Sequence, residues 1–494
     1  MYDLVVRGGR VIDPESGHDG IADVGIKDGR IEAIDDKLGP ARQMIDAKGL
    51  VVAPGFIDLH AHGQSIPADR MQAFDGVTTT LELEIGVLPV ARWYDEQAET
   101  GRVLNYGAST GWAFARIATM TSQQTESSIE GMGRAMRDKR WVEDVASPAE
   151  TAEIVERVRV GLEQGGIGIG FPNAYAPGAG VKELSELCSL AADMGAPTYT
   201  HIAYVSNVDP RSSIEAYTRL IGLAGSTGAH MHICHFNSSS LQDVERAAVL
   251  VRRAQAQGLK VTVEAYPYGT GSTVVGATFF ADPAFPERYG GGYDAIELVA
   301  GRHRFRDRNE LLASQEKDPG ALVLIHFLDV ALNEGHRALL DRSVMFPGGA
   351  IASDAIPWTL ADGTTYRGDA WPLPRDAVSH PRSSGTFTRF LREWVRERQV
   401  TSLIEGLRKC TLIPAQILDT STPAMRKKGR LSPGADADIV VFDYETLTDR
   451  ADFHAMNRPS EGVRHLLVGG ERVIEDGALL LDRRPGRPVR RPHR

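Results

Sequence analysis

The sequence predicts an α/β protein: a distorted (β/α)8 TIM barrel with insertions, plus a small β-sandwich built from both termini. Three observations predict this fold. Short apolar strands joined by glycine-centred turns occupy both ends of the chain. Between them, apolar strands alternate with amphipathic helical patterns, which is typical of a parallel sheet covered by helices. The chain has 494 residues, of which 42% are hydrophobic, so it can bury large cores.

The β-sandwich is expected to combine residues 1–57 with residues 421–482. The first segment contains "YDLVVRGG", "RVIDPESG" and "DVGIKDGRIEAI", in which Asp28-Gly29 between alternating apolar residues is a strong hairpin signal. The second segment contains "ADIVVFD" and "VRHLLVGGERVIEDGALL", again short strands with glycine-centred turns. The similar patterns predict that the two segments pair into one sandwich.

The barrel is expected over residues 58–420, where strand and helix patterns alternate with a spacing that suits eight βα units. Helical patterns include "VKELSELCSLAADMG" and "LQDVERAAVLVRRAQAQG". Two insertions are predicted, residues 283–347 and the Gly/Pro/Trp-rich residues 357–381, a loop long enough to be a lid. The candidate strands are "GFIDLHAH", "GVTTTLELEIG", "GIGIGFP", "PTYTHIAY", "HMHICHFN", "LKVTVEAYPY" and "GGAIASDA".

Charge and composition exclude several classes of protein. Lys and Arg total 55 against 65 Asp and Glu, and the net charge of -10 argues against a general role in binding nucleic acid or anionic membranes. Residues 483–494, "RRPGRPVRRPHR", are the basic exception, and their proline content predicts a solvated flexible tail.

Cysteine usage and hydropathy bear on the compartment. The three cysteines, Cys188, Cys234 and Cys410, form no even framework and no CxxC pair, which favours a reducing compartment. No export signal is recognisable, and nowhere do about 18 apolar residues run uninterrupted. The expected location is the cytoplasm.

Polar residues gather where the predicted barrel strands end, which is the active-site face of such barrels. His60 and His62 end the first strand, and residues two apart on a strand share a face. His201, His235 and Asp354 occupy equivalent positions on later strands. Imidazole nitrogens and carboxylate oxygens are ligands for zinc or a similar divalent metal. These five residues therefore predict a site for one or two metal ions.

Longer motifs carry a resemblance to a known family. "PGFIDLHAH", a strand-end "THI", "ICHF" and "SDAIP", bracketed by the divided β module, resemble the amidohydrolase superfamily of metal-dependent hydrolases. "GFPNAYAPGA", "EAYPYGTGST", "HPRSSGTF" and "GRLSPGADADIVVFD" resemble its D-aminoacylase (N-acyl-D-amino-acid deacylase) branch. The resemblance covers nearly the whole chain and implies hydrolysis of the amide of an N-acyl-D-amino acid or a related compound.

The resemblance also implies roles for individual residues. His60 and His62 match the first metal position of the family, and His201 and His235 match the second. Asp354 matches the catalytic aspartate. The remaining matches are to substrate-binding positions: Arg382 to the arginine that pairs with the α-carboxylate, and Tyr266 and Ser272 to its helpers.

Three departures from the family pattern stand out. The metal-binding cysteine expected after "GVTT" is absent, and "GVTTTLELEIG" offers Glu84 or Glu82; we favour Glu84 because it lies nearer the strand end. The usual "HMRDE" is "HIAYV". A lysine two residues after the second-site histidine is replaced by Asn237, which is expected either to line the pocket or to cap a helix beginning at Leu241. His232 and Cys234 are expected to be packed in the interior.

The expected mechanism follows from this residue set. A metal lowers the pKa of bound water from 15.7 towards about 7 and so supplies hydroxide to attack the acyl carbon. Asp354 would take the proton and then pass it to the departing nitrogen. Arg382 could form a bidentate pair with a substrate carboxylate and thereby fix the chirality at the α-carbon.

Two alternatives stay open at this point. One is a cyclic-amide hydrolase resembling dihydroorotases and hydantoinases, although these commonly bridge two metals with a carbamylated lysine and no predicted strand ends in lysine. The other is a barrel without turnover that serves as a scaffold, which the full set of five site residues disfavours. In either hydrolase reading the partner is a small-molecule amide, and a homo-oligomer is one option for the assembly.

Overall fold

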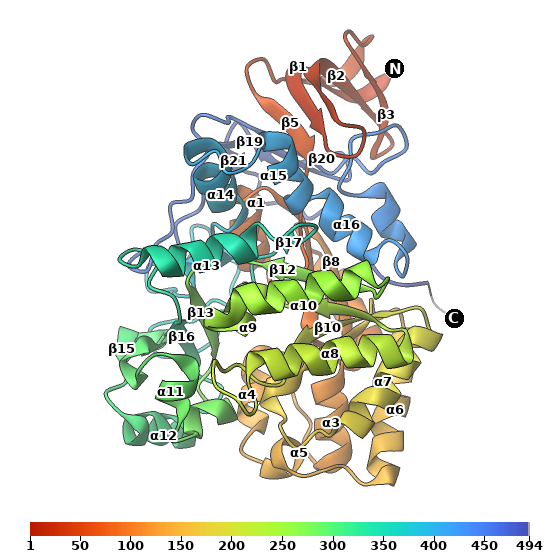
Figure 1. The fold of residues 1–494 in the computed structure, drawn as a ribbon. Helices are drawn as coiled ribbons and strands as arrows, with labels where there is room; N and C mark the ends of the chain where they lie inside the picture. The colour runs from red at the N-terminus through yellow and green to blue at the C-terminus, as the bar shows by residue number, and fades with distance from the viewer. Residues whose placement is uncertain (493–494) are drawn as a thin grey trace.

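The computed structural model describes residues 1–492; residues 493–494, the end of the predicted tail, lie outside the described residues. A β-sheet unit from both ends of the chain sits on a helix-covered barrel, as the red and blue strands at one end of the molecule show (Figure 1). A smaller lobe with α11 (Phe285–Tyr289) and α12 (Arg308–Lys317) projects from the barrel's side. Among the described residues, no helix combines the length and apolar character needed to cross a bilayer.

The barrel sheet contains eight parallel strands in chain order. The ring closes between its first and last strands, where the backbone N–H of His62 donates to the carbonyl of Ala355 at 2.7 Å. This confirms the predicted (β/α)8 barrel. The strands are β6 (Phe56–Asp58), β7 (Val77–Val87), β8 (Asn105–Gly111), β9 (Ile169–Pro172), β10 (Pro197–His201), β11 (His230–Ile233), β12 (Val261–Ala265) and β17 (Ala350–Ile351).

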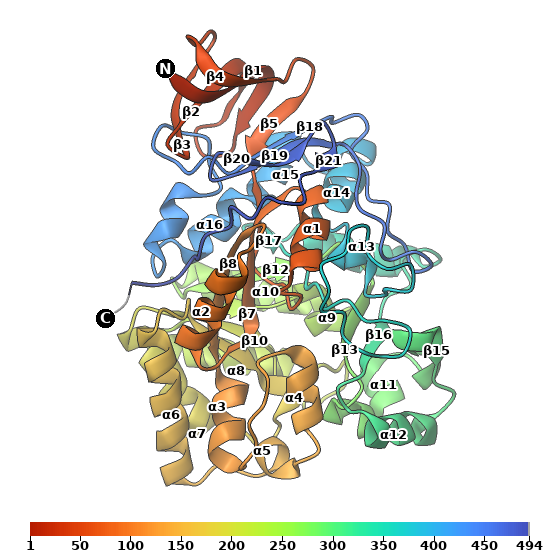
Figure 2. The ribbon, with the colours of Figure 1, turned by 180° about the vertical axis from the view of Figure 1, so that it is seen from behind.

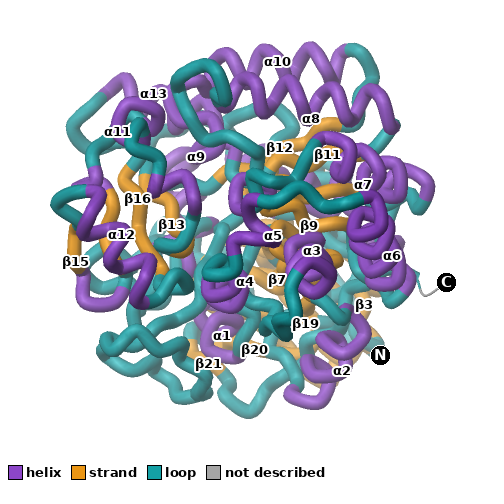
Figure 3. The backbone as a smooth tube through the Cα atoms, turned by 90° about the horizontal axis from the view of Figure 1, so that it is seen from below, coloured by secondary structure: helices purple, strands orange, loops and turns teal. Residues whose placement is uncertain are grey.

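Helices surround these strands, as the view from below shows (Figure 3). The two helical patterns singled out in the sequence form α7 (Val181–Asp193) and α10 (Val244–Ala256), the second after a short 3-10 turn at Leu241–Asp243. Local caps fix several helix starts; Ser147 and Glu150 form a capping box at the start of α6 (Pro148–Glu163). The other outer helices are α1 (Ile66–Phe74), α2 (Val90–Thr100), α3 (Trp112–Met120), α8 (Ser213–Thr227), α13 (Glu334–Val344), α15 (Leu403–Cys410) and α16 (Leu412–Leu418).

Both ends of the chain share one nine-stranded sheet, as the sequence predicts. The halves join where β5 (Val51–Pro54) pairs antiparallel with β18 (Ile439–Phe442). Asp28 and Gly29 form the predicted hairpin turn, and both have positive φ, 51° and 72°. The other strands are β1 (Tyr2–Asp13), β2 (His18–Lys27), β3 (Arg30–Asp35), β4 (Ala41–Asp46), β19 (Val463–Val468), β20 (Glu471–Glu475) and β21 (Ala478–Leu479).

The main insertion has different limits from those predicted. It carries an antiparallel sheet in the order β13-β16-β14-β15, whose first strand begins at Thr270. It ends before α13, because that helix already packs on the barrel helix α10, with Arg342 paired to Glu245 at 2.7 Å. The insertion therefore begins and ends earlier in the chain than the predicted limits, residues 283–347. The strands are β13 (Thr270–Val274), β14 (Ile296–Leu298), β15 (His303–Arg304) and β16 (Leu322–His326).

The predicted lid-like segment, residues 357–381, contains no helix or strand before Pro381 within the described chain. It is nevertheless held in place. Thr365 donates to the carboxylate of Glu130 at 2.7 Å, and the ring of Trp371 stacks on Phe74 with centroids 5.5 Å apart. The loop therefore ties α1 to α4 (Ile129–Ala135) at the edge of the barrel.

The C-terminal segment is not the solvated tail that its composition predicts. It runs along β8, where the backbone N–H of Gly486 donates to Arg102 at 2.8 Å and that of Val489 to Tyr106 at 2.7 Å (Figure 2, dark blue). Val489 is buried in the same apolar cluster as Ile57 at the barrel interior. Backbone pairing, the buried Val489 and arginine contacts such as that of Arg490 over the ring of Tyr94 at 5.4 Å hold this segment. A composition dominated by Arg and Pro shows none of these contacts.

Candidate active site

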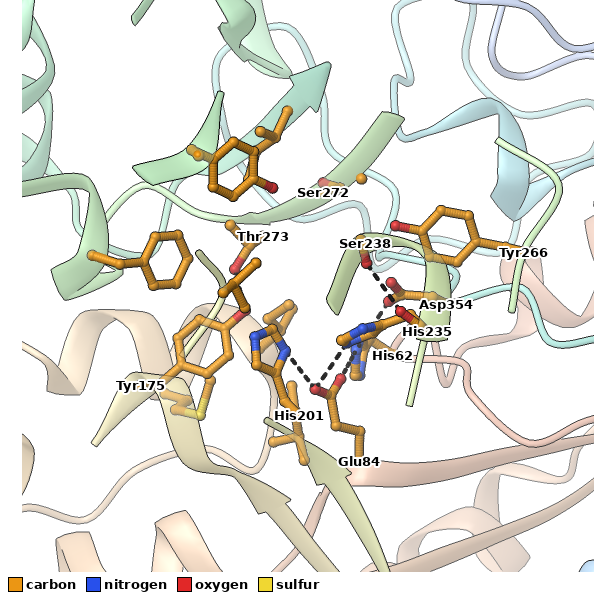
Figure 4. Close-up of a pocket in the computed structure, with 18 residues that line it drawn as sticks. His62, Glu84, Tyr175, His201, His235, Ser238, Tyr266, Ser272, Thr273 and Asp354 are labelled. Atoms are coloured by element: carbon orange, nitrogen blue, oxygen red, sulfur yellow. Dashed lines mark hydrogen bonds and ion pairs between the residues drawn. The ribbon is translucent and has the colours of Figure 1, made fainter. Parts of the chain in front are cut away.

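The five predicted metal-site residues, together with Glu84, converge at the carboxyl ends of the barrel strands. Figure 4 shows all of them except His60. His60 and His62 follow β6, Glu84 lies in β7, His201 ends β10, and His235 and Asp354 follow β11 and β17. Every one of the six side chains is buried. The barrel thus brings together residues that are up to 294 positions apart in the sequence, from His60 to Asp354.

Four side chains form a first group of possible ligands: His60, His62, Glu84 and Asp354. The Nε2 atoms of His60 and His62 lie 3.1 Å apart. Oε2 of Glu84 lies 2.7 Å from the first of these nitrogens and 3.4 Å from the second. Oδ1 of Asp354 lies 3.5 Å from each. Two imidazole nitrogens and two carboxylate oxygens therefore face one point.

A second group shares Glu84 with the first. Its other oxygen, Oε1, lies 2.9 Å from Nδ1 of His201 and 3.3 Å from Nε2 of His235. One carboxylate thus faces two histidine pairs with its two oxygens. Figure 4 shows its contacts with His62, His201 and His235. Glu82 belongs to neither group, because its carboxylate lies behind His62, 2.9 Å from Nδ1.

The backbone takes unusual conformations at two of these residues. His235 and Asp354 have φ values of 34° and 52°, in the left-handed region that non-glycine residues rarely adopt. They lie two and three residues beyond the ends of β11 and β17, where the chain leaves the barrel strands. Strain of this kind concentrates at functional sites, and here it aims two side chains back over the strand ends.

The site carboxylates have lowered pKa values. Burial opposes the charged form of Glu84, but His60 and His235 outweigh it and hold its pKa well below the usual value. Burial likewise opposes ionisation of Asp354, and the charges of Arg382 and His60 lower its pKa. Both carboxylates are therefore ionised at neutral pH, the form that binds cations.

A cavity opens onto these groups. Tyr266 and Ser272 line it, as the resemblance implies, although the hydroxyl of Ser272 already donates to the carbonyl of Val323 at 2.8 Å. Much of the rest of the wall is apolar, with Tyr175, Tyr289 and the following side chains: Ile85, Ile129, Met132, Val205, Phe279 and Ile325.

Arg382 lies directly behind this wall. Its Nη2 atom is 2.9 Å from Oδ2 of Asp354, and its guanidinium lies over the ring of Tyr266 at 4.5 Å. The guanidinium is buried, and its Nε and Nη1 atoms have no hydrogen-bond partner among the described residues. Two strong donors beside Asp354 are thus without a partner, in a side chain that does not itself line the cavity.

Asn237 does not line the cavity, and it does not cap a helix at Leu241. It lies inside the short helix α9 (Phe236–Ser240), and its side-chain Nδ2 donates to the carbonyls of Tyr266 and Tyr268 at 3.0 and 3.2 Å. These bonds hold the chain after β12. Asn237 therefore stabilises the backbone at Tyr266, and the prediction that it contacts the substrate is wrong.

His232 is packed in the interior, as expected, and its partner is a residue that the sequence analysis missed. Glu264 in β12 lies between two histidines, with Oε1 2.5 Å from Nδ1 of His60 and Oε2 3.1 Å from Nε2 of His232. Burial opposes its charge, yet the two histidines lower its pKa to about 2. An acidic residue inside the apolar strand pattern "VTVEAY" was the available signal.

Comparison with known proteins agrees with this geometry. The fold and the ligand groups together define the class: a (β/α)8 barrel whose strand ends carry residues suited to binding metal ions. The chain belongs to the amidohydrolase family, whose profile matches residues 43–474. It is 28% identical to an N-acyl-D-glutamate deacylase of Alcaligenes xylosoxydans xylosoxydans, over 99% of this chain and 96% of that protein.

Two further relatives extend the similarity. A D-aminoacylase of the same organism is 25% identical, over 97% of this chain and 96% of its own length. The crystal structure of N-acyl-D-glutamate deacylase from Bordetella bronchiseptica, complexed with zinc and a phosphonate inhibitor, superposes with a TM-score of 0.76 at 26% identity, covering 99% of both chains. The resemblance to the D-aminoacylase branch is confirmed.

Proposed function

We propose that this protein is a metal-dependent hydrolase that cleaves the amide bond of N-acyl-D-amino acids. One observation carries the proposal: two ligand groups share Glu84 at the closed end of a cavity, with Asp354 and Arg382 beside them. The deacylase relatives support the same reaction class. The residue that the two groups share is Glu84, whereas the cyclic-amide hydrolases of the alternative reading commonly use a carbamylated lysine.

The residues present fit a divalent metal. A tetrahedral ion with bonds of about 2.0–2.1 Å keeps its ligand atoms roughly 3.3 Å apart. In the first group, the two Nε2 atoms are 3.1 Å apart and each lies 3.5 Å from Oδ1 of Asp354. His60, His62, Glu84 and Asp354 would hold one ion, and Glu84, His201 and His235 a second. Bound zinc would act as a Lewis acid towards water and the scissile carbonyl.

Asp354 is placed to move the proton. Arg382 holds its Oδ2 atom at 2.9 Å, so Oδ1 is the oxygen that faces the ligand groups and the cavity. Ionised, Oδ1 accepts a proton from the attacking water and then delivers it to the leaving nitrogen. The amine departs neutral, and Asp354 returns to its carboxylate form.

Arg382 and Tyr266 are placed to fix the amino-acid part of the substrate. The positive guanidinium of Arg382, with hydrogen-bonding capacity left at Nε and Nη1, would attract the α-carboxylate. The ring of Tyr266 holds the guanidinium plane in position. Because the carboxylate, the amide and the side chain then have assigned directions, one enantiomer is favoured.

The cavity wall favours an uncharged apolar substrate side chain. None of the described residues that line the cavity is lysine or arginine, and Ile129, Met132 and Ile325 face its interior. A second carboxylate would lose its hydration there without gaining a cation. N-acyl derivatives of D-leucine, D-methionine or D-phenylalanine are therefore the proposed substrates.

The test is amine release from N-acetyl-D-amino acids by purified, zinc-supplemented protein, with the L-enantiomers, dihydroorotate and hydantoin in parallel. We expect hydrolysis of the D-substrates alone. Asp354→Asn should lower kcat by about 1,000-fold or more, since it removes the proton acceptor. Asp376→Asn, a matched change at an exposed loop residue, should leave kcat unchanged. Ring opening without D-amide hydrolysis would contradict the proposal.

A further inference from the structure

We propose that a chain of hydrogen-bonded side chains inside the barrel positions His60 from the opposite end of the strands. The members of this positioning chain are Glu264, His232, Thr262 and His230. The inference rests on the proposed function, because it assigns these residues to the support of the proposed catalytic site. It follows from a continuous row of contacts between the floor of the barrel, where the strands begin, and the strand ends that carry the site.

The positioning chain occupies the inner faces of two neighbouring strands. His230 and His232 lie two residues apart in β11, and Thr262 and Glu264 lie two apart in β12, so each pair shares a face. The contact of Glu264 with His60 shows that this face is the barrel interior. His230 begins β11 and Thr262 is the second residue of β12, and both are half-buried at the floor. The interior of such a barrel is ordinarily filled by branched apolar side chains, so a polar row there calls for a reason.

Every link is within hydrogen-bonding distance. Oε1 of Glu264 lies 2.5 Å from Nδ1 of His60, and Oε2 lies 3.1 Å from Nε2 of His232. Nδ1 of His232 lies 2.9 Å from the hydroxyl oxygen of Thr262, which lies 2.8 Å from Nε2 of His230. An ionised carboxylate only accepts hydrogen bonds, so both imidazoles beside Glu264 donate to it. A hydroxyl donates one hydrogen bond and accepts another, so Thr262 joins the two histidines of β11.

The orientation of Glu264 depends on this arrangement. Its carboxylate is 1% exposed, and a buried charge requires hydrogen-bond donors. His60 supplies a donor to one oxygen and His232 to the other. Without the second donor the carboxylate is free to turn, and the Nδ1–H of His60 loses its fixed acceptor. That acceptor is what directs Nε2 of His60 towards Glu84, 2.7 Å away.

Thr262 is the link that fixes His232. Its hydroxyl is the partner of Nδ1, and it thereby holds the ring with Nε2 directed at Glu264. His232 is fully buried, so removal of the hydroxyl leaves a buried ring nitrogen without its partner. Thr262 belongs to neither ligand group and does not line the cavity. A change at the floor of the barrel should therefore reach His60 without touching the site.

The test combines kinetics of zinc-supplemented protein on N-acetyl-D-leucine with NMR of the same protein labelled with 15N at histidine. Thr262→Val keeps the shape of the side chain and removes the hydroxyl. We expect it to lower kcat about tenfold, to leave KM unchanged, and to shift the ring N–H resonances of His232 and His60. Thr262→Ser retains the hydroxyl and should stay within about twofold of the wild-type kcat.

Thr198→Val is the matched control. Thr198 is a buried threonine of the neighbouring strand β10, and its hydroxyl contacts Met231 at 3.2 Å instead of a member of the positioning chain. This substitution should change neither kcat nor the resonance of His60.

The two proposals fail separately. If the His60 resonance is the same in Thr262→Val and in the wild type, the positioning chain is wrong even when D-amides are hydrolysed. A shifted His60 resonance in a protein that hydrolyses no D-amide would overturn the proposed reaction and retain the positioning chain. If Thr262→Val fails to fold, His230→Phe removes the outermost link and gives the same comparison.

Discussion

His380 positions Arg382 through its neutral form. Its Nε2–H donates to the carbonyl of Thr270 at 3.0 Å, and its Nδ1 accepts the backbone N–H of Arg382 at 2.9 Å. Only the neutral tautomer with the proton on Nε2 makes both bonds. Burial, and next the charge of Arg382, hold the pKa of His380 well below its usual value.

This arrangement predicts a pH dependence of stability. The unfolded chain protonates His380 near pH 6.5, whereas the folded protein keeps it neutral to far lower pH. Below pH 6.5 the unfolded state binds the extra proton, so the free energy of unfolding falls as pH falls, by about 1.4 kcal/mol per pH unit. Denaturant unfolding between pH 7 and 5 should give the wild type a slope that exceeds that of His380→Asn by about this amount. Substitution of the exposed His454 is the control; equal slopes in wild type and His380→Asn would contradict the assignment.

At the scale of residues, the side chains that gather at the candidate site were predictable because each lies near a strand end and is unusual there. His60 and His62 are recognisable by their two-residue spacing, and Glu84 by its place near the end of β7. Glu264 and the true role of Asn237 were not predictable, since both depend on which neighbour the folded chain presents. The sequence shows which residue types could bind a metal, whereas only the fold shows which side chains hydrogen-bond to them.

At the scale of elements, β8 shows why one strand escaped detection. Its sequence "NYGASTG" has no apolar run, because neighbouring backbone leaves no room for side chains. A Cβ on Gly107 would lie 2.4 Å from the carbonyl oxygen of Val489, and one on Gly111 would lie 2.7 Å from that of Ile85. Because close packing requires small residues in β8, its sequence lacks the run of large apolar residues by which a buried strand is recognised.

The insertion sheet supplies part of the cavity wall, and its chemistry should control selectivity. Ile325 in β16 is 5% exposed and lines the cavity. Ile325→Arg places a cation there, so activity on N-acetyl-D-glutamate relative to N-acetyl-D-leucine should rise on the order of tenfold. The measurement is kcat/KM for both substrates, with thermal unfolding as a check on folding. Leu332→Arg, at a residue 90% exposed on the same insertion, should leave the ratio unchanged; an unchanged ratio in Ile325→Arg would place the substrate side chain elsewhere.

At the scale of the whole molecule, segments that are far apart in the sequence pack together in one sheet or against the barrel. β18 joins the N-terminal strands, and the segment around Val489 covers the barrel beside β8. The pairing of the chain ends was predictable from their shared strand pattern. The packing of the last described segment was not, since it depends on the burial of Val489 and on arginine contacts that composition does not show.

This segment should contribute measurably to stability. Val489 is 1% exposed, so Val489→Ala should lower the free energy of unfolding by about 2 kcal/mol. Deleting residues 485–494 should cost more, because the backbone bonds to Arg102 and Tyr106 are lost as well. Denaturant unfolding measures both. Val145→Ala, at a valine 76% exposed, is the control; equal stability of the deletion variant would mean that the segment only rests on the barrel.

The divided sheet has a consequence for biosynthesis. β5 ends at Pro54 and its partner β18 begins at Ile439. At about 5–20 residues per second, a ribosome needs roughly 20–80 s to make the intervening chain. Throughout that time β5 lacks β18, the strand to which its backbone groups bond in the finished protein. An open strand edge of this kind readily pairs with another chain. The N-terminal sheet is therefore the part of the nascent protein that most needs protection from neighbouring chains on the same messenger RNA.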